Sequence, residues 1–284
     1  MMTVNLAVIL AQAGYRVGLV DLDLQSPTTQ EILGCPDNLV GYTLHDYLFD
    51  QCQISEIATP VYPATVALIP ALGVTDAVSM TPTASAPLFM MSGSTELDDI
   101  AELLRSGYDP QRLIDGFSQL QQTLNLDYLL IDTHPGLGEE ALLAIAIADV
   151  VLMLLLPEVQ SIQQGAVSVE VARKLGVNCI FPVINLVPET IDPGTLQTTI
   201  RELYDIIHTA WVPFAADVAL QGKTVISESE QPPSLLRDFL HAIAEYLVKL
   251  AEQTTARELS GKAEDGAITA TQNQSRAVRR QPPP

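Results

Sequence analysis

The chain has 284 residues, and 48% of them are hydrophobic, which is enough for one large α/β domain or two small ones. Its formal net charge of −20 argues against a broad electrostatic DNA footprint and against adhesion to anionic lipid. The three cysteines share no metal-binding or redox spacing, and their odd number gives no complete disulfide framework. We therefore expect a cytoplasmic protein, since the sequence also lacks a signal peptide and an uninterrupted transmembrane run.

The chain opens with a helical pattern and a short strand. Residues 4–13 predict a helix that ends at Gly14, a residue suited to a helix C-terminus. Residues 16–20 predict a strand, and the acids Asp21 and Asp23 follow it at once.

Residues 35–95 show little regular pattern, and we expect them to form an irregular insertion. A short helix at 44–49 and a strand at 66–69 are predicted within it. Residues 74–94 are rich in Thr, Ser, Pro and Met, which predicts a long, mobile surface loop.

Helices and strands alternate from residue 96 onward, which predicts right-handed βαβ units in a doubly wound, mostly parallel sheet. The polar stretch from residue 254 to 284 predicts a disordered tail, so the expected domain is 1–253. Predicted helices cover 96–105, 110–124, 139–147, 159–175, 194–208, 215–221 and 234–252, and predicted strands cover 128–131, 150–155, 179–184 and 211–214.

The segment LDYLLIDTHPGLG contains the most informative of these strands. Residues 128–131 are apolar without alternation, which predicts a strand buried on both faces. The strand runs into Asp132, and Pro135 and Gly136 then turn the chain tightly. An acid at this place is typical of a Walker B strand, where it holds Mg²⁺ at a nucleotide. The alternative is a loop whose acid caps the next helix.

Polar residues also follow other predicted strands. Asp21 and Asp23 come after the first strand, and Asn185 comes after the strand at 179–184. Because parallel strands end at one edge of a sheet, these groups could converge with Asp132 on Mg²⁺ and an attacking water. The alternatives are a solvated turn at the two aspartates and an ordinary turn residue at Asn185.

Four segments together resemble the ParA/MinD-type ATPases, the deviant Walker A branch of the P-loop NTPases. VNLAVILAQAGYRVGLVDLDLQSP is similar to the helix and strand that follow the phosphate loop in that family. LDYLLIDTHPGLGEEALLAIAIADVVLMLLLPEVQSIQQGAVSVE is similar to its Walker B and switch II region, and FPVINLVP and VPFAADVALQGKTVI to its segments around the base. The resemblance covers most of residues 3–250, is poor over 35–95 and is absent from the tail.

The resemblance implies roles around ATP and Mg²⁺. Asp23 would position the hydrolytic water, Asp21 would support the loop and the metal shell, and Asp132 would hold Mg²⁺ through water. Gly136 would lie near the γ-phosphate, while His134 would be a switch-loop residue rather than a catalyst. At the base, the family pattern implies that Asn185 hydrogen-bonds adenine, with Pro213 and Phe214 nearby.

The phosphate loop of the family pattern has no counterpart in this sequence. The phosphate loop, K-G-G-x-G-K-[ST], would stand directly before Met1, and the central first strand would precede it. Without that nest of N–H groups and its lysines we expect weak ATP binding or none. We also expect that Met1 is not the natural beginning, because a sheet without its central strand leaves two neighbours with unpaired backbone groups.

The leading functional hypothesis is a ParA/MinD-like ATPase that cycles between an ATP-held homodimer and a monomer to position or partition a cargo, such as a chromosome. Its protein cargo or adaptor is unknown. The alternative is a non-hydrolysing relic or scaffold on the same fold, and a metabolic or kinase-like relative ranks last. Direct DNA or membrane binding has little support, because basic residues cluster only at Arg276, Arg279 and Arg280 in the tail.

Overall fold

A computed structural model describes residues 2–33, 35, 41–61, 86–214 and 240–249. The chain divides into two compact units, Met1–Leu240 and His241–Pro284. Residues 240–249 are helical, which confirms part of the helix predicted over 234–252. The predicted strand at 66–69, the helix at 215–221 and the tail from 254 lie outside the described residues. Within the described ranges no helix combines the length and apolar character needed to cross a membrane.

The described part of the first unit alternates helices and strands, as the sequence predicts. The helices are α1 (Met2–Gln12), α2 (Thr29–Ile32), α3 (Leu44–Leu48), the 3-10 helix η2 (Ile54–Ile57), α5 (Leu97–Ser106), α6 (Pro110–Leu124), α7 (Glu139–Ile147), α8 (Val159–Lys174) and α9 (Pro193–Tyr204). The strands are β1 (Val17–Asp21), β2 (Thr59–Val61), β3 (Leu88–Met91), β4 (Tyr128–Asp132), β5 (Val150–Leu155), β6 (Cys179–Val187) and β7 (Ala210–Pro213).

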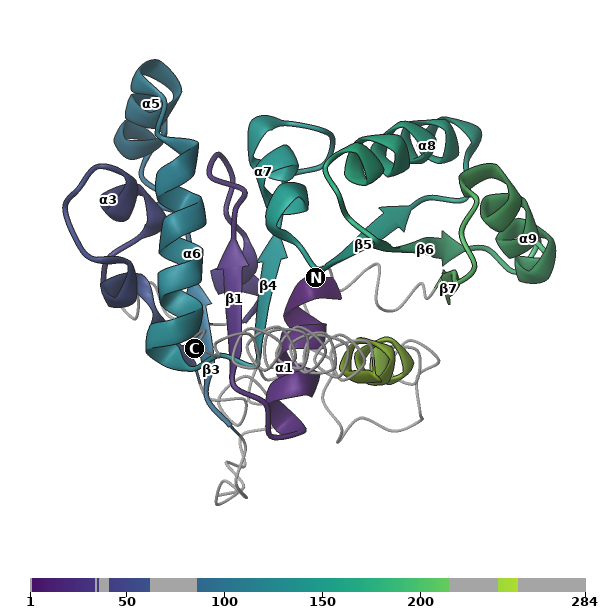
Figure 1. The fold of residues 1–284 in the computed structure, drawn as a ribbon, viewed down its shortest axis with the longest axis horizontal. Helices are drawn as coiled ribbons and strands as arrows, with labels where there is room; N and C mark the ends of the chain where they lie inside the picture. Colours follow the sequence, from purple (N-terminus) through teal and green to yellow (C-terminus); the bar gives the residue numbers. More distant parts are fainter. Residues whose placement is uncertain (1, 34, 36–40, 62–85, 215–239, 250–284) are drawn as a thin grey trace, which may run out of the picture. The chain divides into compact units, whose positions relative to one another are not determined.

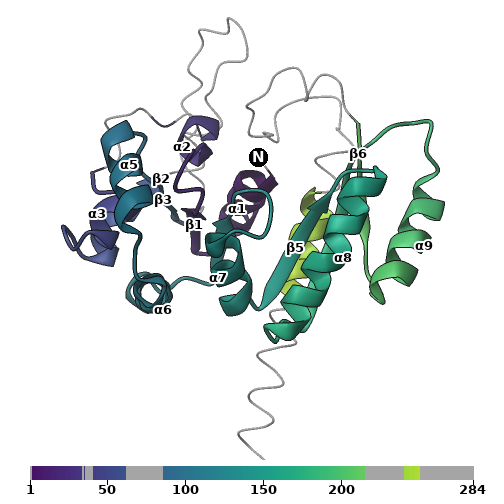
Figure 2. The same ribbon diagram turned by 90° about the horizontal axis from the view of Figure 1, so that it is seen from above.

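The first sheet has the strand order β2-β3-β1-β4 (Figure 1). β1 pairs in parallel with β3 and β4, and β2 adds an antiparallel edge against β3. Helix α1 contacts β1, β3 and β4 on one face, while α6 and α7 lie on the other (Figure 2). Helices on both faces of a mostly parallel sheet confirm the predicted doubly wound α/β class.

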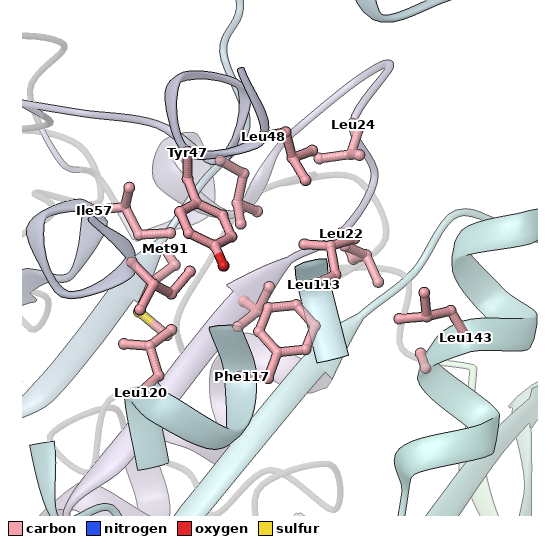
Figure 3. Close-up of a cluster of buried hydrophobic side chains, with 14 of the residues drawn as sticks. Leu22, Leu24, Tyr47, Leu48, Ile57, Met91, Leu113, Phe117, Leu120 and Leu143 are labelled. Carbon is pink, nitrogen blue, oxygen red and sulfur yellow. The ribbon is translucent and has the colours of Figure 1, made fainter. Parts of the chain in front are cut away.

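The core between this sheet and its outer helices is built from side chains far apart in the sequence. Figure 3 shows Phe117 of α6 close to Leu113, with Tyr47 of α3 and Leu143 of α7 around them. Asp109 caps α6 by accepting a hydrogen bond from the Gln111 amide, which fixes where this apolar helix face begins. The amphipathic helices therefore bury their apolar stripes against the strands that carry the acids.

The second sheet has the order β5-β6-β7, and both of its strand pairs are parallel. Helices α8 and α9 supply a separate core, in which Val169, Ala172, Ile200 and Tyr204 pack with Met153 and other strand residues. Helix α7 belongs to both cores, because Leu143 packs in the first and Ile145 packs against the second.

The prediction that the strand at 128–131 is buried on both faces is wrong. Every residue of β4 is only partly buried, whereas all five residues of β1 are buried. Within the described residues β4 is an edge strand that pairs with β1 alone, and β5 is likewise an edge that pairs with β6 alone. The apolar run therefore predicted the strand correctly, but it did not predict how many strands pair with it among the described residues.

The insertion at 35–95 is more regular than predicted. Residues 88–91, expected to lie in a mobile loop, form β3 and pair in parallel with β1 from Val17 to Val20. β2 and η2 lie in the same region, and the sequence analysis missed both. The segment is short and follows Pro87, so its local pattern is weak, and its conformation depends on pairing with a distant strand. Residues 74–85 of the expected loop lie outside the described residues.

Each core contains a tyrosine that packs against a helical glycine. The Tyr47 hydroxyl donates a hydrogen bond to the Arg112 carbonyl at 2.9 Å, and the Tyr204 hydroxyl donates to the Ile162 carbonyl at 2.6 Å. A Cβ at Gly116 would lie 2.7 Å from the Tyr47 hydroxyl, and a Cβ at Gly165 would overlap the Tyr204 hydroxyl. Burial raises the pKa of Tyr204 to about 12, so the ring remains a neutral donor.

We predict that Gly116→Ala destabilises the protein although alanine favours helix. The propensity gain of about 1 kcal/mol is outweighed by overpacking of about 1–3 kcal/mol and the disturbed tyrosine hydrogen bond. Urea unfolding should show a net loss, and Ser118→Ala, at an exposed site on the same helix, should show none. If Tyr47→Phe does not reduce the effect of Gly116→Ala, the tyrosine contact is not its cause.

His45 joins α3 to the loop that follows β3. Its side chain is 1% exposed, and its Nδ1 accepts a hydrogen bond from the Ser94 amide at 2.9 Å. A hydrogen bond accepted at Nδ1 requires that this nitrogen carries no proton. Burial lowers the pKa of His45 below its ordinary value of 6.5, although Asp99, Asp46 and the Leu24 carbonyl act in the opposite direction. The folded state therefore holds this imidazole neutral.

We predict that His45 makes the protein less stable at mildly acidic pH. Because its folded pKa is lowered, the unfolded chain binds the extra proton first, and stability is lost as pH falls below about 6.5. The loss is at most about 1.4 kcal/mol per pH unit for one group. Urea unfolding at pH 7.5 and 5.5 measures it. His45→Asn retains an acceptor for Ser94 and cannot titrate, so an equal pH dependence in this variant would contradict the assignment.

Candidate functional site

Two acids meet at the carboxyl edge of the first sheet. The parallel register of β1 and β4 pairs Val20 with Ile131 and Asp21 with Asp132. The ladder continues one step further, because the Leu22 amide donates to the Asp132 carbonyl at 2.8 Å. The prediction that Asp21 and Asp132 share one edge of the sheet is therefore confirmed.

Asp21 is 1% exposed and organises the loop that follows β1. Its Oδ2 accepts hydrogen bonds from the amides of Thr28 at 2.7 Å and Thr29 at 2.9 Å. Its Oδ1 accepts from the Asp23 amide at 3.2 Å. Burial raises the pKa of Asp21, the threonine hydrogen bonds lower it, and the nearby Asp132 adds a smaller upward effect. Asp21 therefore connects the end of β1 to the loop, and its predicted role at a metal site stays a prediction.

Asp132 is only partly buried. Its Oδ1 accepts a hydrogen bond from the Thr3 hydroxyl at 2.7 Å, so the beginning of α1 lies beside the carboxyl end of β4. The sequence analysis missed Thr3, and no local signal marks it, because residues 3 and 132 meet only in the folded chain. The hydroxyl fixes one carboxylate oxygen of Asp132 at the edge.

Asp23 lies in a turn beyond β1, where its Oδ1 accepts from the Ser26 amide at 3.0 Å. It lines a pocket of about 90 Å³ together with Leu22, Leu24, Gln25, His134, Gly138, Glu140 and Ala141. This volume holds a few water molecules and is well below the roughly 300 Å³ of a small-molecule site. Glu140 is a second carboxylate here that the sequence analysis did not single out, and its only signal is an acid in the first turn of α7.

The turn after β4 is open to solvent. Gly136 has a φ of +103°, a conformation that side chains rarely adopt, and no atom lies within 4 Å of a Cβ placed there. His134 is exposed, and its Nδ1 lies 2.7 Å from the Pro135 carbonyl. His134 also lines the pocket that contains Asp23 and Glu140, and its role as a switch-loop residue stays a prediction.

The predicted adenine-binding residues belong to the second sheet. Asn185 lies in β6 at an irregular step, because the register with β7 shifts between Ile184 and Val187. Val187 pairs with Pro213, and its carbonyl accepts from the Phe214 amide at 2.9 Å. Phe214 is 51% exposed. These contacts bring the ends of β6 and β7 together. Asn185 was predicted to share one sheet edge with the aspartates, but among the described residues it lies within β6 of the second sheet, whereas Asp21 and Asp132 end strands of the first.

The side chains present suit a hard cation better than they suit ATP. Asp23 and Asp132 offer carboxylate oxygens, the donors that Mg²⁺ prefers, whereas both oxygens of the buried Asp21 already accept backbone amides. The pocket lining adds Glu140 and contains no lysine or arginine. A triphosphate needs cationic side chains and a nest of amides, so the described residues do not provide its cradle. Within the described ranges no group of three or more His, Cys, Asp or Glu residues could hold a metal by itself.

The comparisons with known proteins point to one family. A family model for ParA, described as NUBPL iron-transfer P-loop NTPase, matches residues 1–254. An uncharacterised ATP-binding protein of Methanocaldococcus jannaschii is 28% identical over 183 residues, which is 64% of this chain and 57% of the relative. The chain thus spans little more than half the length of that relative.

Two MinD proteins are also similar. A putative septum site-determining protein MinD from Oltmannsiellopsis viridis is 25% identical over 92% of this chain and 71% of its own length. The solved structure of MinD from Pyrococcus horikoshii, complexed with Mg-ADP, aligns with a TM-score of 0.66 and 21% identity. It covers 88% of this chain and 90% of that one, and at this identity it supports the fold alone.

We predict that Asp21→Ala frees the loop of residues 22–29 without unfolding the sheet. Two amide hydrogen bonds to a charged acceptor would be lost, each contributing about 1.5–3 kcal/mol. Amide hydrogen exchange at Thr28 and Thr29 should therefore accelerate at least about tenfold. Asp127→Ala, at the opposite end of the neighbouring strand β4, is the control. Unchanged exchange at both threonines would show that Asp21 does not hold this loop.

Proposed function

The chain belongs to the ParA family of P-loop NTPases, and on that premise we propose that it serves as a MinD-like positioning ATPase. Its cellular task would be to position or partition a cargo, such as a chromosome. The observation that carries this proposal is the pairing of Asp21 with Asp132 at the carboxyl edge of one parallel sheet, with Asp23 in the next turn. Paired carboxylates at a sheet edge suit Mg²⁺ at a nucleotide.

The proposed roles follow from these positions. Asp132 would hold Mg²⁺ through water, Asp21 would keep the loop in place, and Asp23 would position the hydrolytic water. Gly136 would approach the γ-phosphate, since its open turn leaves room for another group. Asn185, Pro213 and Phe214 would contact the adenine, because β6 and β7 bring their ends together. When bound, Mg²⁺ would neutralise charge on the phosphates.

In this proposal the functional result of nucleotide binding is the association of protein subunits, rather than the release of a chemical product. We propose that nucleotide controls a homodimer, which recognises a protein cargo or adaptor in the cytoplasm. The net charge of −20 makes a basic partner surface more suitable than DNA. Iron transfer, which the description of the family model includes, gains no support from Cys35, Cys52 and Cys179. Cys52 is buried and its pKa is raised to about 11, so it is a poor thiolate ligand.

A non-hydrolysing scaffold on the same fold is the second candidate. The acidic pocket favours it, because Asp23 and Glu140 line a space with no cationic side chain among its lining residues. Repulsion between these carboxylates and a triphosphate would weaken binding unless other groups compensate. A scaffold would retain the sheet and a partner surface but have no hydrolytic turnover.

We predict that the 284-residue chain releases no appreciable phosphate from Mg-ATP. The reason is the missing cationic cradle among the described residues. The measurement is phosphate release by the purified chain, with titration of a fluorescent ATP analogue for binding. Release that Asp132→Ala abolishes and Asp127→Ala leaves intact would contradict the prediction and establish the ATPase. The two variants remove one carboxylate each from opposite ends of the same strand region.

The two candidates differ once a phosphate loop is supplied. In a chain extended by a strand and K-G-G-x-G-K-[ST] ahead of residue 1, the proposed ATPase should hydrolyse ATP and form a nucleotide-dependent dimer. Asp23→Ala should then slow hydrolysis far more than binding. Binding without turnover in the extended chain would favour the scaffold, and an unchanged turnover rate in the variant would remove Asp23 from catalysis.

A further inference from the structure

His45 is a buried imidazole that lies between two loops at the carboxyl edge of the first sheet. The Asp23 loop comprises residues 22–28 after β1, and the Ser94 loop comprises residues 92–96 after β3. Because β1 and β3 pair in parallel, both loops leave the sheet at the same edge. The side chain of His45 is 1% exposed, so its ring nitrogens depend on protein groups rather than water for hydrogen bonds.

The Ser94 loop is attached directly to the imidazole. The Ser94 amide donates a hydrogen bond to Nδ1 of His45 at 2.9 Å, and Gly93 packs beside the ring. A Cβ at Gly93 would lie 3.3 Å from Cε1 of His45 and 3.5 Å from Cγ of Pro27. The missing side chain at residue 93 therefore lets the imidazole and Pro27 of the other loop pack on one short piece of backbone.

The Asp23 loop reaches the same ring through Leu24 and Pro27. Leu24 is 1% exposed and packs in the first core with Leu48 of α3 (Figure 3), and its carbonyl faces the imidazole as an acceptor. Asp23 stands directly before Leu24, and its carboxylate accepts from the amide of Ser26, the residue before Pro27. A movement of Leu24 and Pro27 therefore also moves the turn that contains Asp23.

The contact with Ser94 fixes which ring nitrogen carries the proton. Nδ1 accepts a hydrogen bond, so the neutral imidazole carries its proton on Nε2. Among the described residues Nε2 has no partner at full hydrogen-bonding geometry, although the Leu24 carbonyl acts on the ring. A second proton would go to Nδ1 and would face the Ser94 N–H, which is also a donor. Protonation of His45 therefore breaks this link between the ring and the loop.

Burial and two carboxylates act on the charge of the ring in opposite directions. Burial has the largest effect and lowers the pKa of His45 below its ordinary value of 6.5, whereas Asp99 of α5 and Asp46 of α3 raise it. Asp99 also accepts a hydrogen bond from the Ser94 hydroxyl at 2.6 Å. The two loops contribute groups that do not titrate, namely the Leu24 carbonyl, Pro27, Gly93 and Ser94. The imidazole is therefore neutral at pH 7 and gains a proton only in mild acid.

We propose that His45 is a positioning residue for the Asp23 loop: its neutral imidazole holds this loop against the Ser94 loop, and its protonation releases both. A proton on Nδ1 removes the acceptor of the Ser94 amide and repels that N–H. The Ser94 loop then moves away from the ring, and Pro27 loses the backbone on which it packs. This device operates in the free chain and does not depend on the proposed ATPase.

The test is an NMR titration of the full chain from pH 7.5 to 5 without nucleotide. Imidazole nitrogen shifts identify the tautomer of His45, whose signals are the ones missing in His45→Asn among the four histidines. At pH 7.5 the proton should lie on Nε2. As His45 gains its second proton, amide protection factors at Ser26, Thr28 and Ser94 should fall together by at least about tenfold. A proton on Nδ1 at pH 7.5, or protection that does not change as His45 titrates, would overturn the proposal.

Three variants separate His45 from other acids that titrate in this range. His45→Asn keeps an acceptor for Ser94 and gains no proton, so its loop protection should not change with pH. Asp99→Asn removes a charge that favours the protonated ring, so the loop transition should move to lower pH together with the His45 titration. Asp98→Asn, at an exposed site of the same helix, is the matched control and should leave both unchanged.

The remaining outcomes also decide the question. A transition that persists in His45→Asn would assign it to another group, such as the buried Asp21, and the proposal would be wrong. A His45 that stays neutral until the whole chain unfolds would overturn it as well. Loop release that follows the His45 titration in the unchanged chain and in Asp99→Asn supports it.

Discussion

The parallel ladder between β1 and β4 is the constraint on which the candidate site depends. Its register sets Asp21 opposite Asp132, and the bond from Leu22 to the Asp132 carbonyl carries the pairing past the end of the strand. A slip of one residue would send Asp21 to the opposite face of the sheet and separate the two carboxylates. All five residues of β1 are buried, so a slip would also move each of its side chains into packing shaped for a different residue.

The site residues on the strands were predictable because their signal is local. An apolar run fixes a strand, and the acid that ends it must lie at the carboxyl edge of a parallel sheet. The Thr3 hydroxyl on Asp132 and the place of Glu140 in the pocket were not predictable in this way. Each depends on an approach between segments that the local sequence does not encode. The predicted catalytic and nucleotide-binding roles remain proposals.

The fold class was predictable from the strand–helix rhythm, but the neighbours of individual strands were not. β3 lies in a segment whose composition suggested a loop, and its pairing with β1 decides its conformation. The apolar sequence of β4 fits a central strand, whereas the described residues place it at an edge. The hydrophobicity of a strand indicates how much apolar surface it must bury, but it does not indicate which segment covers that surface.

Helix α7 is shared by the two hydrophobic cores of the first unit, because Leu143 packs in one core and Ile145 packs against the other. Loss of either sheet would therefore expose apolar surface of the helix that also covers the other sheet. Such sharing favours one cooperative unfolding transition for the two sheets rather than two separate transitions.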